Sequence, residues 1–333
     1  MPHRFGPWLH AGVVALVAST ICATAAGAET FPERPLTIVV PYAPGGPTDV
    51  IARVLGERMG RTLGQTFVTN NLPGASGTIA ADHVARSTPD GYTLLLHHTA
   101  LVAAPSLFLN LRYDTRSAFA PVGLVNTGPL VIVGRKSLPA TTAQELFAWI
   151  RANGDKVTVG HSGLGSSSHL CSVLLELALG TKMTFVTYRG AAPSMTDLMA
   201  GQIDLVCDQS TNSVPQILAG TIKAYAVTSA ERNAALPDVP TTAEVGQSSV
   251  TFSIWHALYV PKGTPTAIVE RLNAALAEAV EDKAVQDKFA LVGTVVYPKA
   301  MRSVAAHAEL FGKEYDRLAR LIEAAGIRSG EAK

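Results

Sequence analysis

The chain has 333 residues, of which 47% are hydrophobic and 16% are charged, with 27 lysines and arginines against 26 acidic residues. This composition can bury large cores, so extensive disorder is excluded, and the length favours two domains over one. The formal net charge of +1 argues against a nucleic-acid binder, whose surface usually has a strong basic excess. A single bound anion stays compatible with this balance.

The N-terminal 28 residues have the pattern of a secretory leader. Arg4 is followed by no formally charged residue before Glu29, the stretch 9–21 is largely apolar, and Ala26-Gly27-Ala28 supplies the small residues of a cleavage site. We therefore predict a signal peptide, residues 1–28, that is cleaved after Ala28. The alternatives are a membrane anchor, because the uncharged stretch could nearly span a bilayer, and a lipoprotein modified at Cys22.

Strand-like and helix-like segments then alternate, which is typical of βαβ units and a largely parallel sheet. We predict strands at 36–40, from 67, and at 92–96, 121–133, 157–160, 183–187, 203–207, 222–227 and 252–260. We predict helices at 47–63, after 77, and at 169–179, 192–200, 266–280, 283–291 and 301–325. The expected organisation is two α/β domains joined by crossing strands, one made of residues 29–128 plus 254–333 and the other of residues 129–253.

A glycine-rich loop, Pro44-Gly45-Gly46-Pro47-Thr48-Asp49, lies between the first predicted strand and helix. Glycines let backbone N–H groups turn toward a ligand, and the helix start adds unpaired donors with a positive partial charge, which suits a carboxylate. Asp49 is suited to capping the helix or to binding a water or an ammonium group. The alternative is an ordinary tight turn.

A second loop with the same position in the second unit, His161 to His169, offers backbone donors and four serine hydroxyls ahead of an apolar helix. Two such loops, one in each domain, favour a ligand site, because small ligands usually bind in the cleft between domains.

Enzyme motifs are incomplete in this sequence. Gly160-His161-Ser162-Gly163 begins a nucleophile elbow, but Leu164 replaces the final glycine. Gly163-Leu164-Gly165 begins a dinucleotide-binding motif, but Ser168 stands at the third glycine. The neighbours His97 and His98 face opposite sides of a strand and are poorly placed to share a metal. We therefore predict no catalytic residue, no metal and no cofactor.

Two further segments follow predicted strands. Tyr188-Arg189-Gly190 places a cation near the expected cleft, where Arg189 is suited to a second ligand carboxylate, although a solvated surface arginine is the alternative. Asp208 opens the polar segment 208–212, which suits a ligand amine or hydroxyl, or simply a polar crossing segment. Cys171 and Cys207 are candidates for a disulfide in an oxidising compartment, with two buried free thiols as the alternative.

Several ordered motifs together resemble the Bug family, the periplasmic solute receptors of tripartite tricarboxylate transporters. They cover the chain from about residue 31 to 325 and read, in order, Phe31-Pro32-Glu33-Arg34-Pro35, Pro41-Tyr42-Ala43-Pro44-Gly45-Gly46-Pro47-Thr48-Asp49, Asn71-Leu72-Pro73-Gly74-Ala75-Ser76-Gly77, Pro89-Asp90-Gly91-Tyr92-Thr93-Leu94, Tyr188-Arg189-Gly190-Ala191-Ala192-Pro193, Asp197-Leu198-Met199-Ala200-Gly201-Gln202-Ile203-Asp204 and Leu236-Pro237-Asp238-Val239-Pro240-Thr241.

The resemblance implies a type II periplasmic-binding-protein fold, with two α/β domains closing on a di- or tricarboxylate, an acidic amino acid or an aromatic acid. It implies that one ligand carboxylate is held between the two loops, largely by backbone N–H groups and water. The loop residues concerned are Tyr42, Pro44, Gly45, Gly46, Thr48, Asp49, Ser162, Gly163, Gly165, Ser166, Ser167 and His169. Further contributions are implied for Ser76, Gly77, Thr99 and Asp208. Tyr188 and Arg189, from the segment described above, complete the predicted site.

The expected function is therefore that of an exported, monomeric, non-catalytic receptor that passes an organic acid to the permease subunits of such a transporter. The alternatives are a receptor that signals through a membrane sensor and a periplasmic hydrolase that uses Ser162. The resemblance does not imply the disulfide, since many relatives lack the cysteines. An exported location favours a bridge between Cys171, at a helix start, and Cys207, at a strand end of the same domain.

Overall fold

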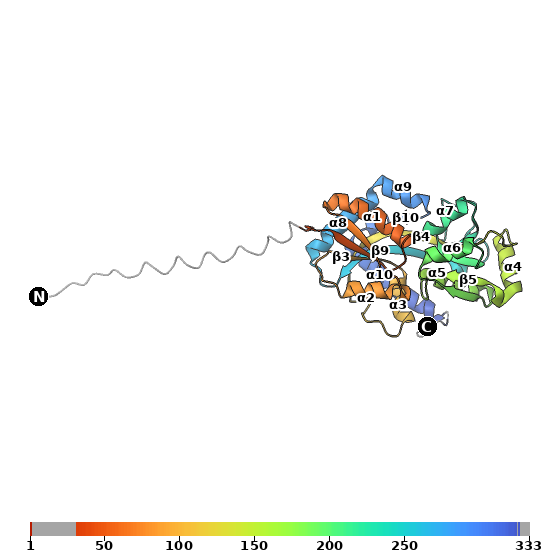
Figure 1. The fold of residues 1–333 in the computed structure, drawn as a ribbon. Helices are drawn as coiled ribbons and strands as arrows, with labels where there is room; N and C mark the ends of the chain where they lie inside the picture. The colour runs from red at the N-terminus through yellow and green to blue at the C-terminus, as the bar shows by residue number, and fades with distance from the viewer. Residues whose placement is uncertain (2–30, 325, 327–333) are drawn as a thin grey trace.

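The structure, a computed structural model, describes residues 1, 31–324 and 326 (Figure 1). The predicted cleavage site at Ala28 lies outside the described residues. Among these residues, no helix combines the length and the apolar character that crossing a membrane requires.

The first domain contains the N-terminal and the C-terminal elements, drawn in red, orange and blue on the left of Figure 1. Its strands are β1 (Leu36–Val40), β2 (Phe67–Asn71), β3 (Thr93–His98), β9 (Ser253–Pro261), β10 (Val295–Val296) and the first part of β4 (Phe119–Arg135). Its helices are α1 (Pro47–Leu63), α2 (Thr78–Ala85), α3 (Ala100–Leu107), α8 (Thr266–Glu281), α9 (Lys283–Leu291) and α10 (Val304–Ala324).

The second domain contains the middle of the chain, drawn in yellow-green to green on the right of Figure 1. Its strands are β5 (Thr158–His161), β6 (Thr184–Thr187), β7 (Leu205–Gln209), β8 (Ile222–Val227) and the last part of β4. Its helices are α4 (Ala143–Asn153), α5 (Ser167–Leu179), α6 (Ala191–Met199) and α7 (Ser210–Leu218).

The long strand β4 belongs to the sheets of both domains, and the strand order is β2-β1-β3-β9-β4-β7-β5-β6, with β8 and β10 also paired to β4. Residues 119–129 of β4 run antiparallel to β9, and residues 130–135 run antiparallel to β7 and β8. The outer pairs β1–β2, β1–β3, β5–β6 and β5–β7 are parallel, as the alternation of strands and helices predicts. The sheet switches partners at residues 129 and 130, and we keep 29–128 plus 254–333 and 129–253 as the proposed domain division.

Both faces of each sheet are covered by helices. In β1, Ile38 and Val40 pack with α1, α8 and α9 in one buried cluster, whereas Val39 packs with α2, α3 and α10 in another. In the second domain, Val131 and Val206 pack against α6 and α7, whereas α4 and α5 cover the opposite face. This explains why the parallel strands appear in the sequence as continuous apolar runs.

Thr228 connects the two segments that cross between the domains. It is fully buried; its N–H donates to Leu130 O at 2.9 Å, and its hydroxyl donates to Phe252 O. Phe252 N–H in turn donates to Thr228 O at 2.8 Å. Because Leu130 lies in β4 and Phe252 precedes β9, Thr228 holds the two crossing segments together.

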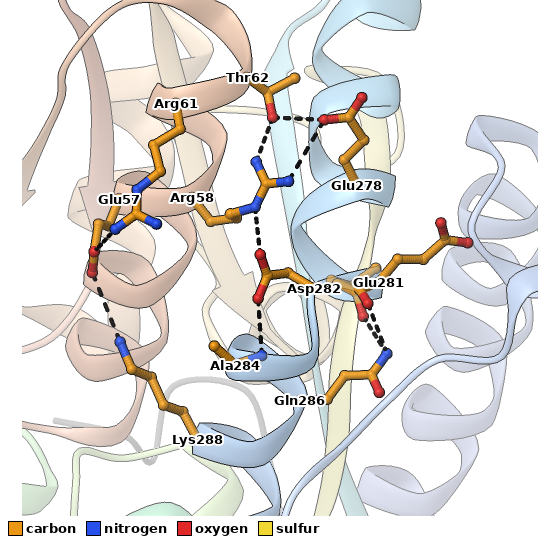
Figure 2. Close-up of polar contacts among 11 residues, drawn as sticks. Glu57, Arg58, Arg61, Thr62, Glu278, Glu281, Asp282, Ala284, Gln286 and Lys288 are labelled. Atoms are coloured by element: carbon orange, nitrogen blue, oxygen red, sulfur yellow. Dashed lines mark hydrogen bonds and ion pairs between the residues drawn. The ribbon is translucent and has the colours of Figure 1, made fainter.

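Helix α1 is anchored at its C-terminal half to α8 and α9 by the polar contacts in Figure 2. Arg58 Nε lies 2.7 Å from Asp282 Oδ2, and Thr62 Oγ1 donates to Glu278 Oε2 at 2.7 Å. Asp282 also accepts from Ala284 N–H at 2.9 Å, which caps the start of α9. These contacts hold the C-terminal half of α1 against α8 and the start of α9.

Three helices, α3, α4 and α7, lie outside the elements that we predict from the sequence. Helices α3 and α7 contain internal prolines, Pro105 and Pro215, and α7 begins within the segment read as a polar crossing. Proline is favourable in the first turn of a helix and disruptive beyond it, so both prolines weaken the helix signal of these segments. The remaining predicted helices and strands agree with the structure to within a few residues.

Candidate ligand-binding site

A pocket of about 390 Å³, a volume that includes open solvent at its mouth, lies where the two domains meet. Residues of both domains line it: Tyr42, Gly46, Pro47, Thr48, His98, Leu130, Ser162, Ser167, Ser168, Ala191, Asp208, Gln209 and Ile254. A concave site between domains with a few polar groups is typical of small-molecule binding.

Four helices begin at the wall of this pocket. Gly46 is the N-cap of α1, Ser167 is the first residue of α5, Ala191 is the first of α6 and Gln209 is the N-cap of α7. The first N–H groups of a helix have no carbonyl partner within it, and the helix dipole gives this end a positive partial charge. The pocket therefore attracts an anion without a lysine or arginine among its lining residues.

The first loop is held in place by Asp49, which is buried and is not among the pocket-lining residues. Its oxygens accept from Gly45 N–H at 3.0 Å, from Arg53 at 2.9 and 3.0 Å, and from Asn71 Nδ2 at 3.1 Å. Burial alone would raise the pKa of Asp49, but these hydrogen bonds and the Arg53 charge hold that pKa below its usual range. Asp49 thus acts as a brace that fixes the loop around Gly46.

The second loop satisfies most of its own backbone donors. Ser162 N–H donates to Ser168 Oγ at 3.1 Å, Gly163 N–H to His161 Nδ1 at 3.3 Å and Gly165 N–H to His169 Nδ1 at 3.1 Å. Ser166 caps α5 by accepting from His169 N–H at 3.2 Å. Among the described residues, the loop N–H groups outside these contacts include those of Leu164, Ser167 and Ser168, of which Ser167 and Ser168 line the pocket.

Tyr42 and His98 form one wall as a stacked pair, with ring centroids 4.8 Å apart and ring planes 4° from parallel. His256 lies directly opposite His98 on the neighbouring strand β9, and its ring is 5.6 Å away. Burial, together with the neighbouring imidazoles His97 and His256, places the pKa of His98 well below its usual value. His98 Nδ1 accepts from Ala100 N–H at 3.1 Å, so the proton of the neutral ring lies on Nε2.

Asp208 contributes the one carboxyl group among the lining residues. It follows Cys207 near the end of β7, is 2% exposed, and accepts from Asn212 Nδ2 at 2.7 Å. Burial raises its pKa to about 7, although the hydrogen bonds from Asn212 and from the backbone of Gln209 act in the opposite direction.

Several contacts cross the cleft beside the pocket. Ser76 Oγ donates to Leu164 O, and the Thr99 and Ser167 hydroxyls lie 2.6 Å apart. Gly190, with a φ of 142°, approaches Ala43 so closely that a Cβ on it would lie 3.3 Å from the Ala43 N and Cβ atoms. These contacts show a closed arrangement of the two domains, in which a side chain at residue 190 would interfere.

Of the predicted site residues, six line the pocket together: Tyr42, Gly46, Thr48, Ser162, Ser167 and Asp208. Ten others are not among the lining residues: Pro44, Gly45, Asp49, Ser76, Gly77, Thr99, Gly163, Gly165, Ser166 and His169. Of these, Ser76 and Thr99 bridge the cleft, and Gly45, Asp49, Gly163, Gly165, Ser166 and His169 form hydrogen bonds within the loops. Tyr188 donates its hydroxyl to Asp197 at 2.6 Å. Arg189 is exposed and does not belong to the pocket wall, which matches the surface alternative.

The lining residues that were not predicted are Pro47, His98, Leu130, Ser168, Ala191, Gln209 and Ile254. Pro47, Ser168, Ala191 and Gln209 adjoin predicted residues or lie within predicted loops, so a rule that includes the whole first helical turn would have found them. Leu130 and Ile254 lie at the crossing strands, and only the tertiary structure brings them to the pocket.

Ser162 lacks the surroundings of a nucleophile. No hydrogen bond among residues 31–324 joins its hydroxyl to an imidazole, because His161 contacts Gly163 and Thr187 instead. The described residues also contain no group of three or more histidine, cysteine or acidic side chains placed to hold a metal ion.

Cys171 and Cys207 form a disulfide bond, with Cα atoms 6.1 Å apart. The bond connects α5 to β7 in the second domain, so the expected pairing is confirmed. It joins the two elements that carry Ser167 and Asp208 to the pocket.

Comparison with known proteins identifies related chains. Residues 51–327 match the family model described as tripartite tricarboxylate transporter family receptor. The chain is 44% identical over 313 residues to a "UPF0065 protein in the TAR-I ttuE-ttuC' intergenic region" of Agrobacterium vitis, covering 94% of this chain and 90% of that relative.

Two solved structures extend this similarity to the fold. The periplasmic binding protein BugD is 41% identical, with a TM-score of 0.88, over 90% of this chain and 100% of BugD. MatC from Rhodopseudomonas palustris with bound malate is 37% identical, with a TM-score of 0.85, over 88% of this chain and 100% of MatC.

Proposed function

This chain belongs to the tripartite tricarboxylate transporter receptor family, and we propose that it captures a small organic carboxylate between its two domains and delivers it to the permease of such a transporter. The family consists of solute-binding receptors rather than enzymes, so no catalytic role is assigned to Ser162. Export to the periplasm, after cleavage of the predicted leader at Ala28, is part of the proposal.

The observation that carries the proposal is the convergence of four helix starts on one interdomain pocket. Backbone N–H groups at Thr48, Ser167 and Ser168 replace the water around a carboxylate and donate charge-assisted hydrogen bonds. The malate in the MatC complex is a carboxylate ligand of a related protein with the same fold, which agrees with this chemistry.

Binding is reversible and depends on hinge closure. The crossing segments at Thr228 let the domains separate, and the contacts of Ser76 and Thr99 across the cleft reform when the ligand is enclosed. A permease that favours the closed receptor would then distinguish the loaded from the empty state.

The test is calorimetric titration with dicarboxylates, acidic amino acids and aromatic acids, each paired with its neutral amide. We expect acids to bind and amides to fail, because only the carboxylate gains from the helix starts. Gly46→Val should abolish binding, since Gly46 lines the pocket, yet leave the fold intact, since the nearest atom to a Cβ there is Ala43 O at 3.5 Å.

The matched control is Gly312→Val in α10, where a Cβ meets no atom within 4 Å. This variant should bind like the wild type. Equal binding of acids and amides, or full affinity in Gly46→Val, would contradict the proposed site.

A further inference from the structure

The pocket combines an anion-binding environment with a buried acid. Four helices start at its wall, and its lining residues include no lysine or arginine. Asp208 is the only lining residue with a carboxyl group. Arg189, the cation nearest in sequence, is exposed and outside the wall. A ligand that presents only carboxylates would therefore meet a second acid with no side-chain cation to offset it.

Asp208 has only part of its hydrogen-bonding capacity used by other side chains. Its Oδ2 accepts from Asn212 Nδ2 at 2.7 Å and the backbone of Gln209 also donates to the carboxyl, whereas no further side chain among residues 31–324 does. A carboxyl that is 98% buried is costly unless donors surround it, and this one faces the pocket. A carboxylate has about four acceptor positions, so those that face the pocket stay open to a donor on the ligand.

We infer that the ligand is an organic acid with a hydroxyl or ammonium group close to its carboxylate, so that the helix starts hold the carboxylate and Asp208 accepts from the neighbouring donor. This inference rests on the proposed function and narrows its ligand class. Ser167, Ser168 and Asp208 line the same pocket, so one small molecule spans both groups.

The two other titratable lining residues do not compete for this role. Burial raises the pKa of Tyr42 above its usual value and lowers that of His98, so both stay neutral near pH 7. Asp208, with a pKa near 7, is ionised at pH 8 and is then purely an acceptor.

An acid that lacks the donor leaves the remaining acceptor positions of Asp208 unfilled when the cleft closes. Sites that are built to hydrogen-bond a ligand group discriminate strongly against analogues that lack the group. The structure thus predicts selectivity by a penalty on the wrong ligand as well as by attraction to the right one.

The experiment uses calorimetry at pH 8 with matched sets of acids that differ only at the carbon next to a carboxylate. One set is succinate, malate and aspartate; a second is glutarate, 2-hydroxyglutarate and glutamate; a third is phenylacetate, mandelate and phenylglycine. In whichever set fits the pocket, we expect a hydroxy or amino acid to bind at least ~10-fold more tightly than the unsubstituted acid.

Asp208→Asn should reduce this discrimination toward parity, because the amide is no longer an acceptor on both atoms. Asp155→Asn is the matched control, since Asp155 is exposed and its substitution removes the same charge from the same domain. It should keep the wild-type selectivity, and thermal unfolding would verify that both variants are folded.

Equal affinity for substituted and unsubstituted acids in the wild type would overturn the inference and leave the proposed function standing. Unchanged discrimination in a folded Asp208→Asn variant would also overturn it. If none of the nine acids bound, the proposed function itself would be contradicted.

Discussion

Two hydroxyl groups of the first domain contact the second domain at the edge of the pocket. Thr99 Oγ1 lies 2.6 Å from Ser167 Oγ, and Ser76 Oγ donates to Leu164 O. These bonds exist only while the loops of the two domains meet, so they stabilise the closed arrangement rather than the fold of either domain. At the scale of single residues, Ser76 and Thr99 therefore act in closure beside the pocket, whereas Ser167 takes part both in closure and in the pocket wall.

We predict that Thr99→Val speeds ligand dissociation with little effect on the free protein. Valine keeps the volume of the fully buried threonine but removes its hydroxyl, and the loss of one hydrogen bond corresponds to a rate increase of about 2- to 10-fold. Stopped-flow fluorescence would measure the dissociation rate of a bound acid.

Thr196→Val is the control for this substitution. Thr196 Oγ1 donates to Ala192 O at 3.1 Å within α6, so its loss does not affect a contact between domains. If both variants released ligand at the wild-type rate, Thr99 would have no part in closure.

At the scale of elements, the start of α5 is fixed to the end of β7 by a covalent bond. Cys171 lies one helical turn beyond Ser167, and Cys207 directly precedes Asp208. The disulfide therefore connects the helix start that is proposed to bind the carboxylate with the acid that is proposed to accept from the donor. It pre-organises two walls of the pocket before a ligand arrives.

We predict that the double variant Cys171→Ser/Cys207→Ser loses both stability and affinity. Bridging cysteines 36 positions apart restricts the unfolded chain, which corresponds to a stabilisation of about 3–4 kcal/mol. Urea unfolding would give the stability, and calorimetry in buffer without denaturant would give the dissociation constant.

Chemical reduction of the wild type should reproduce both effects. An affinity that stays unchanged in the folded double variant would show that the bridge stabilises the second domain without positioning its ligand groups.

At the scale of the whole molecule, buried histidines dominate the response to acid. Burial lowers the pKa of six of them, to about 3 for His97, His161, His256 and His307, to about 4 for His169, and well below the usual value for His98. A histidine in the unfolded chain binds a proton near pH 6.5, whereas these stay neutral in the folded protein. Stability therefore falls as the pH decreases from about 6.5 toward 4.

Asp208 acts in the opposite direction. Its pKa in the folded protein, about 7, lies above the usual value, so its protonation adds stability as the pH falls below about 7. One group of this kind does not offset six histidines. The unliganded protein should consequently be most stable near or above neutral pH.

His307 in α10 isolates this effect, since it is not among the pocket-lining residues. It is fully buried beside Tyr259, and neither ring nitrogen has a hydrogen-bond partner among the described residues. We predict that His307→Leu stabilises the protein, with a gain that grows by up to about 1.4 kcal/mol for each pH unit below 6.5. Urea unfolding between pH 4.5 and 8 would measure it.

His83→Leu is the matched control, because His83 is exposed on α2. The stability of the His83→Leu variant should change with pH in the same way as that of the wild type. A His307→Leu variant whose advantage did not increase in acid would show that His307 is protonated in the folded state.

Much of the fold follows from local patterns in the sequence. The apolar run at 36–40, the turn Gly45-Gly46-Pro47 and the apolar spacing after it predict β1, the loop and α1, because each depends on neighbouring residues. The same holds for β8 and α9. Helix α7 was not predicted, because Pro215 and its polar start resemble a loop until packing against β4 and β7 supports the helix.

The candidate site was predictable in part for the same reason. Gly46, Ser162 and Ser167 occupy strand-to-helix loops, where local chemistry indicates anion binding. The roles of Asp49 and Thr99 were not evident, because Arg53, Asn71 and Ser167 decide where those side chains point.

The sequence by itself determined that two α/β units carry glycine- and serine-rich loops ahead of helices, and that the motifs are those of a receptor family. The α/β units could be predicted because helix starts, turns and apolar periodicity are encoded within a few residues. The family was indicated by the resemblance of several ordered motifs. Only the tertiary structure decided which loop residues face the pocket, because Asp49 is bound by Asn71 of β2 as well as by its neighbours Gly45 and Arg53, and because Asp208 is brought to the pocket wall by the pairing of β7 with β4. The near-neutral charge count gave no indication of the site, since the positive ends of helices attract an anion without adding a formal charge.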